Sequence, residues 1–255
     1  MRRRERFVFF ALLLGLLFWL IQLVPMEWRY WAIGGFGLFT YLASALVLRD
    51  DLQIREWFVI LPFIAIYSLT MGAFYFLLPD NFWSTIIILG LFVLGMYSLF
   101  LTANIFSVAK GRTIQLTNAA QSIALFFATF ISLLGSQIIF SFYLPFYFNA
   151  PIIFAFHLPL LLTITWSVNL EDKISAKVWQ LSFFGALIMA EFALIFSFLP
   201  IAVWNIALLM MSIFYLILGI CQTYLREKFF KTAINEYLFL TGFIILMFVL
   251  FFPGK

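Results

Sequence analysis

Residues 113–142 read TIQLTNAAQSIALFFATFISLLGSQIIFSF, and this uncharged stretch decides how the rest of the chain is interpreted. Its length exceeds the roughly 20 residues that a membrane-spanning helix needs. On a helical projection six of its polar residues fall on one stripe, namely Gln115, Asn118, Ser122, Thr129, Ser132 and Ser136. Hydrocarbon offers such groups no hydrogen bonds, so the stripe must face protein or a wet cavity. We therefore predict a helix at the centre of a membrane bundle.

The composition of the whole chain supports a membrane protein. Hydrophobic residues make up 65% of the 255 residues and charged residues only 10%, with a mean hydropathy of +1.11. A water-soluble protein of this size could not bury so much apolar surface. The net charge of +4 does not indicate a nucleic-acid partner, because no soluble segment is long enough to present a basic face.

Nine apolar segments have lengths close to one bilayer crossing. They are residues 7–24, 28–48, 57–78, 82–106, 113–142, 151–168, 178–199, 201–224 and 236–252. The joins between them are short, and none resembles a linker between domains. We predict an all-α polytopic bundle of about nine transmembrane helices in a single domain over residues 1–255.

The basic residues predict how the chain crosses the membrane, because Lys and Arg beside the spans stay on the cytoplasmic side. With a cytoplasmic N-terminus and an outside C-terminus, thirteen of the fifteen basic residues lie inside, and only Arg29 and Lys255 lie outside. One missed or extra span would place every later loop on the opposite side of the membrane, and the basic residues would no longer gather on the cytoplasmic side. The predicted location is a membrane, and we favour the bacterial inner (cytoplasmic) membrane.

Glu191 is the most informative single residue, since it lies in the interior of the apolar segment LIMAEFALIF. A carboxyl inside a membrane span is a functional hypothesis by default. His157, Gln137 and Asn205 lie at similar predicted depths from the outer side. We predict a polar pocket formed by these four residues, with Glu191 hydrogen-bonded or ion-paired to His157. The alternative is a protonated Glu191 that bonds one neighbour and has only a structural role.

A second polar group lies at the inner end of the helix that contains residues 113–142. Lys110 and Arg112 could hold a lipid phosphate or a partner there, together with Gln115 and Asn118. The alternative is that these residues satisfy the helix end and act as topology signals.

Other chemistry is less well supported by the residues. Cys221 is the only cysteine and His157 the only histidine, so no intrachain disulfide and no paired-histidine zinc motif can form. No serine nucleophile elbow or phosphate-binding loop is present. We predict no metal and no cofactor, and we lean against an enzyme.

One segment carries a resemblance to a known group of proteins. The stretch ANIFSVAKGRTIQLTNAAQSI, residues 103–123, resembles a segment of uncharacterised multipass membrane proteins of candidate-phylum bacteria. That group has no assigned activity, so the resemblance implies no catalytic residue in this chain.

Three functional classes stay open at this point. We favour a non-catalytic membrane subunit or scaffold whose partners are membrane lipids and other membrane proteins. The first alternative is a small-molecule or lipid carrier with a polar pocket around Glu191. The second is an intramembrane enzyme that acts on a lipid-linked substrate.

Overall fold

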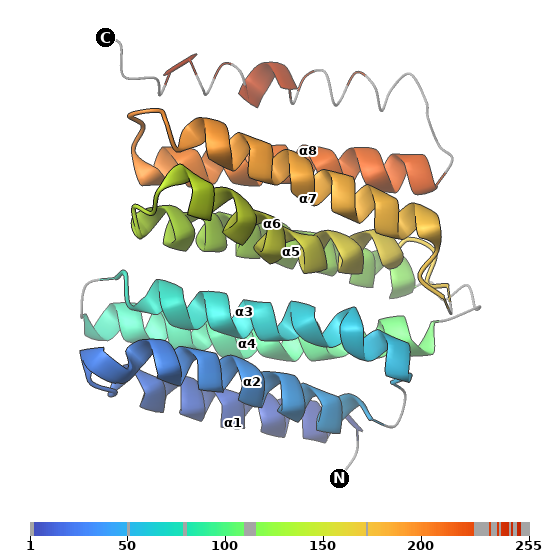
Figure 1. Ribbon diagram of the computed structural model, residues 1–255. Helices are drawn as coiled ribbons and strands as arrows, with labels where there is room; N and C mark the ends of the chain where they lie inside the picture. Colours follow the sequence, from blue (N-terminus) through green and yellow to red (C-terminus); the bar gives the residue numbers. More distant parts are fainter. Residues whose placement is uncertain are drawn as a thin grey trace. The chain divides into compact units, whose positions relative to one another are not determined.

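The computed structural model describes residues 3–49, 52–78, 81–109, 116–171 and 173–226, and in the C-terminal segment residues 235, 239, 241–244, 246, 249 and 250. Every regular element in these residues is helical. The elements are α1 (Arg3–Gln22), η1 (Met26–Trp28), α2 (Arg29–Leu48), η2 (Ile54–Phe58), α3 (Ile60–Tyr75), α4 (Phe82–Val108), α5 (Leu116–Ser141), α6 (Phe146–Trp166), α7 (Ala176–Phe196) and α8 (Val203–Leu225) (Figure 1).

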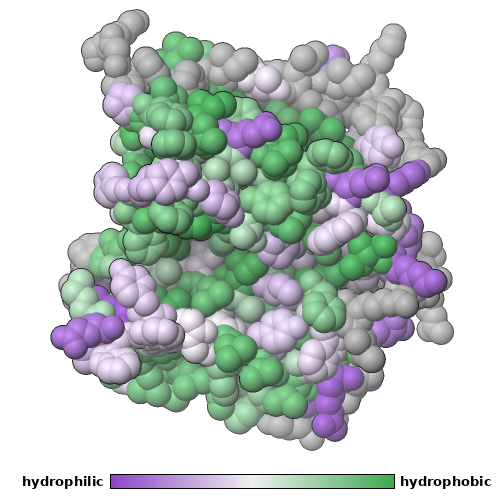
Figure 2. Space-filling model, in the orientation of Figure 1, coloured by the Kyte–Doolittle hydropathy of each residue, from purple (hydrophilic) through white to green (hydrophobic). Residues whose placement is uncertain are grey.

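Eight of these helical segments are long and apolar enough to cross a membrane. They correspond to the first eight predicted spans, and the prediction of an all-α polytopic membrane bundle is confirmed. The ninth predicted span, residues 236–252, falls mostly outside the described residues. Much of the visible surface is hydrophobic (Figure 2), as the lipid-facing sides of such helices require.

The chain divides into two compact units, Met1–Phe127 and Ala128–Lys255. In the first unit, α1 packs against α2 and α4, and α3 packs against α2 and α4. In the second unit, α6 packs extensively against α7, and α8 packs against both. The prediction of a single transmembrane domain stays a prediction.

Aromatic rings fill the core of the first unit. The ring of Phe92 on α4 is stacked on that of Phe18 on α1, with centroids 4.4 Å apart, and on that of Tyr67 on α3 at 5.8 Å. The Tyr67 hydroxyl donates a hydrogen bond to the carbonyl of Leu91 at 3.0 Å. Gly95 makes room for this hydroxyl, because a Cβ at that position would overlap it. In this core the rings of Phe18, Phe92 and Tyr67 therefore pack against one another, and Tyr67 also packs against Gly95.

The sixth span begins earlier than predicted. Pro145, rather than Pro151, precedes the first turn of α6, and its carbonyl accepts hydrogen bonds from the amides of Phe148 and Asn149. Pro151 and Pro159 both lie inside the helix. Proline fixes a φ angle that suits a helix start. The predicted span, residues 151–168, began at Pro151, five residues after the first residue of α6, Phe146.

The polar stripe of α5 is buried over only part of its length. Ser132 and Ser136 are fully buried, whereas Asn118 and Ser122 are exposed, and Gln115 lies outside the described residues. Asn118 and Ser122 belong to the first two turns of the helix, and the Ser122 hydroxyl donates to the Asn118 carbonyl at 3.1 Å. At these two residues the stripe is not covered by described protein, and the Ser122 hydroxyl, which is bonded within its own helix, needs no other partner.

Candidate functional site

Glu191 lies on the exposed face of α7, in the fifth of its roughly six turns. It precedes the last residue of the helix, Phe196, by five residues, or about 7.5 Å at 1.5 Å per residue. Glu191 itself is exposed. Its neighbours on that face are large apolar side chains, namely Phe184, Leu187, Ile188, Leu194 and Ile195, each at least 40% exposed. Within the described residues no hydrogen bond or ion pair engages its carboxylate.

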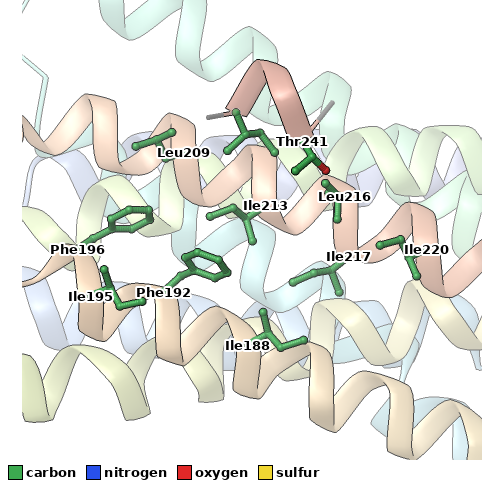
Figure 3. Close-up of a pocket in the computed structure, with 11 residues that line it drawn as sticks. Ile188, Phe192, Ile195, Phe196, Leu209, Ile213, Leu216, Ile217, Ile220 and Thr241 are labelled. Atoms are coloured by element: carbon green, nitrogen blue, oxygen red, sulfur yellow. The ribbon is translucent and has the colours of Figure 1, made fainter. Parts of the chain in front are cut away.

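An elongated apolar cavity of about 560 Å³ lies beside this face, between α7, α8 and the C-terminal segment (Figure 3). Its walls are formed by Ile188, Phe192, Ile195 and Phe196 of α7, by Leu209, Ile213, Leu216, Ile217 and Ile220 of α8, and by Thr241 and Ile244. Among the described lining residues, Thr241 alone has a polar side chain. In Figure 3 the side chains of Phe192 and Ile213 point toward the space between the two helices. The cavity therefore suits an apolar ligand.

Glu191 is not one of the residues that line the cavity, but it lies next to two of them on the surface of α7. Ile188 and Ile195 both line the cavity, and they are 40% and 51% exposed. Glu191 follows Ile188 by three residues and precedes Ile195 by four, spacings that place side chains next to each other on a helix surface, with Cβ atoms about 5–6 Å apart. The carboxylate thus flanks the exposed rim of an otherwise apolar cavity.

His157 occupies a different and closed environment. The residue is fully buried on α6, where its Nε2 lies 2.9 Å from the Ser132 hydroxyl of α5 and its Nδ1 lies 3.0 Å from the Ile153 carbonyl. A carbonyl can only accept, so Nδ1 carries the proton and Nε2 accepts from the Ser132 hydroxyl. The ring centroids of Phe156 and Phe214 lie 5.0 and 5.1 Å from the centroid of the imidazole.

The structure does not pair Glu191 with His157. Both ring nitrogens of His157 are already engaged, and the ring is buried whereas Glu191 is exposed. Gln137 is buried on α5 and its Oε1 has no partner among the described residues. Asn205 is half-buried in the first turn of α8. As a functional pocket, these four residues stay a prediction.

The inner-face residues are described only in part. Lys110, Arg112 and Gln115 lie outside the described residues. Asn118 is exposed near the start of α5, and its carbonyl accepts from Ser122. A role for these four residues in binding a lipid phosphate or a partner stays a prediction.

The contact between Ser132 and His157 joins a hydroxyl and an imidazole, the groups of a nucleophile and its base, but a substrate cannot reach them. A catalytic pair must reach a substrate, and both residues are 0% exposed. The arrangement can satisfy two polar side chains and fix the position of α5 against α6. Among the described residues no group of three or more His, Cys, Asp and Glu side chains could hold a metal ion.

Sequence reasoning missed two features of the second unit. Ser132 was part of the predicted polar stripe, but its partner on α6 could not be chosen from hydropathy. The cavity was not predicted, because its lining residues belong to the same apolar pattern as lipid-facing residues. Only Glu191 gave a signal near the cavity.

The family model described as "Protein of unknown function (DUF5656)" matches residues 30–251, which is most of the chain. The chain therefore belongs to this family. No curated protein and no solved structure matches it.

Proposed function

We propose that this member of the DUF5656 family is a non-catalytic membrane protein that binds the hydrocarbon chain of an amphiphile between α7 and α8. The observation that carries this proposal is the elongated cavity of about 560 Å³ with its apolar walls. The proposal is a form of the alternative that the sequence offered, a small-molecule or lipid carrier. It differs in that the binding site is an apolar cavity and not a polar pocket around Glu191.

The size of the cavity agrees with a bound ligand. Ligand sites have volumes of roughly 300–1,000 Å³, and this cavity falls within that range. Its α8 wall runs from Leu209 to Ile220, a distance of about 16 Å along the helix at 1.5 Å per residue. An apolar space that extends about 16 Å along α8 favours an extended hydrocarbon chain over a compact solute.

The lining chemistry supports an apolar cargo. A polar solute placed there would lose its hydrogen bonds to water and regain few, at a cost of about 2–7 kcal/mol for each unpaired group. A hydrocarbon chain has no such groups. Ile195 and Ile220 line the cavity and are 51% and 41% exposed, so a chain can enter sideways from the surrounding lipid.

The wider sequence predictions remain compatible with this proposal. A subunit or scaffold role can accompany lipid binding, because the exposed apolar faces of other helices stay available to partners. The intramembrane-enzyme alternative gives Glu191 the role of acid or base and gives Lys110 and Arg112 the role of binding a phosphate, and the last two residues lie outside the described residues. The bacterial cytoplasmic membrane stays the expected location, on the distribution of basic residues.

The proposal is tested with a photoreactive probe that carries a diazirine on a long alkyl chain. The full chain is reconstituted in lipid vesicles, illuminated with the probe and digested, and the labelled peptides are identified by mass spectrometry. We expect labelling to concentrate on the peptides that contain Ile188–Phe196 and Leu209–Ile220.

The matched variants are Leu216→Trp and Tyr215→Trp. Leu216 lines the cavity, so the larger ring fills it, whereas Tyr215 is 42% exposed and is absent from the lining. Leu216→Trp should remove most of the labelling in these peptides and Tyr215→Trp should leave it unchanged. Ile220→Trp provides a second filling variant at a more exposed position. Equal labelling in all variants would overturn the proposal.

A further inference from the structure

The carboxylate of Glu191, next to two residues that line the cavity, points to the class of ligand. We infer that the cavity binds a single-chain amphiphile whose polar end is a cationic amine, held by Glu191 while its hydrocarbon chain lies between α7 and α8. This inference rests on the proposed function and adds the chemistry of the polar group to it.

The exposure of Glu191 is the first observation behind the inference. A carboxylate inside a membrane-spanning helix is costly, and such residues almost always face protein or a water-filled cavity and have a partner. Glu191 is exposed among apolar side chains, and no partner is seen in the described part of the chain. A ligand that supplies the partner would offset this cost.

Charge complementarity favours a cationic ligand over a residue of the described spanning helices. In the described spanning helices, each Lys or Arg lies in the first four residues of its helix, as Arg6, Arg29 and Lys177 illustrate. The Nε atom of Arg29 donates a hydrogen bond to the Val24 carbonyl at 3.4 Å, and its guanidinium carbon lies 4.6 Å from the centroid of the Phe76 ring. A second copy that presents α7 would bring one carboxylate against another. A cationic amine is the complementary group.

The depth of Glu191 restricts how the amine is attached. The carboxylate lies about 7.5 Å inside the end of α7 at 1.5 Å per residue, level with cavity-lining residues on both sides in sequence, Ile188 and Ile195. An amine carried directly on a hydrocarbon chain reaches this level while the chain stays in the cavity. A headgroup that is separated from its chains by a glycerol phosphate would have to leave the interface.

The test compares three diazirine probes that share one alkyl chain and end in an amine, an alcohol or a carboxylic acid. The full chain in vesicles is labelled with each, and the labelled α7 and α8 peptides are quantified. In the unmodified protein we expect the amine to label most and the acid least. A charge-assisted hydrogen bond contributes about 1.5–3 kcal/mol, so Glu191→Gln should reduce amine labelling about tenfold or more.

The matched control is Glu27→Gln, which changes an exposed carboxyl in η1 of the first unit and should leave the preference for the amine unchanged. Equal labelling by all three probes, or an unchanged preference in Glu191→Gln, would overturn the inference and leave the cavity as a site for hydrocarbon. Labelling that Leu216→Trp does not reduce would overturn the proposed function itself. The two failures are therefore distinguishable.

Discussion

The two units of the chain pack their helices in different ways. In the first unit, aromatic rings from α1, α3 and α4 stack in contact, and Gly95 admits the Tyr67 hydroxyl. In the second unit, a buried polar contact links α5 to α6, while α7 and α8 enclose a cavity of about 560 Å³. The comparison teaches that the described aromatic core of the first unit is filled by rings, whereas α7 and α8 of the second unit leave an open space, so substitutions in these two regions should differ in kind.

The largest expected effect is at Phe92 in the first unit. Its side chain is 0% exposed and is stacked between Phe18 and Tyr67. Phe92→Ala should lower the free energy of unfolding by about 3–5 kcal/mol, because the ring contacts are lost and the space is not refilled. Thermal and denaturant unfolding in lipid–detergent mixtures measure this change.

The matched control for this first variant is Phe192→Ala. Phe192 is half-buried and already lines the cavity, so its truncation removes fewer contacts and should lower stability by less than Phe92→Ala does. Equal losses at the two positions would contradict the contrast between a filled and an open region.

A smaller loss is expected when a methyl group is added to α4. Gly95→Ala places a Cβ where the Tyr67 hydroxyl lies, which forces the ring to move and should destabilise the protein by about 1–3 kcal/mol. Gly90→Ala on the same helix is the control, because nothing lies within 4 Å of the added Cβ. Unfolding curves of the two variants give the comparison, and a stable Gly95→Ala variant would show that the first unit tolerates repacking.

Loss of the buried hydrogen bond between Ser132 and His157 should lower the free energy of unfolding by about 1–2 kcal/mol. Ser132→Ala leaves the Nε2 atom of His157 without its hydrogen-bond donor, and loss of one such bond inside a membrane protein has an effect of this order. Ser136→Ala is the matched control, since Ser136 is also 0% exposed but its hydroxyl has no partner among the described residues. The free energies of unfolding of the two variants should differ, and identical values would remove the contact from the account of stability.

The smallest effect on stability is expected at the cavity. Leu216→Trp adds volume to a space that is already present, so the free energy of unfolding should change by less than about 1.5 kcal/mol, even though ligand labelling is lost. Unfolding measured with and without the alkyl amine separates the two effects. A large destabilisation would show that this region is packed as tightly as the first unit.

Hydropathy predicted the helices but not all of their functional surroundings. The eight described spans follow from apolar segments between charged or proline-marked joins, since the bilayer admits few other structures. Glu191 could be singled out from the sequence, because a carboxyl inside a membrane span is costly and usually has a functional role. Its expected partner, His157, proved to be bonded to Ser132 and Ile153 instead, because similar depth does not determine which helix faces bring two side chains together.

The amino-acid sequence by itself determined that the chain is a bundle of membrane-crossing helices and that Glu191 lies inside one of them. This follows because the hydrocarbon core has a fixed thickness and accepts no unpaired backbone polar groups. Tertiary structure alone decided that His157 is enclosed, that Glu191 is exposed, and that α7 and α8 leave a cavity beside it. These features depend on the rotation and spacing of neighbouring helices, which arise from side-chain packing between segments distant in the sequence.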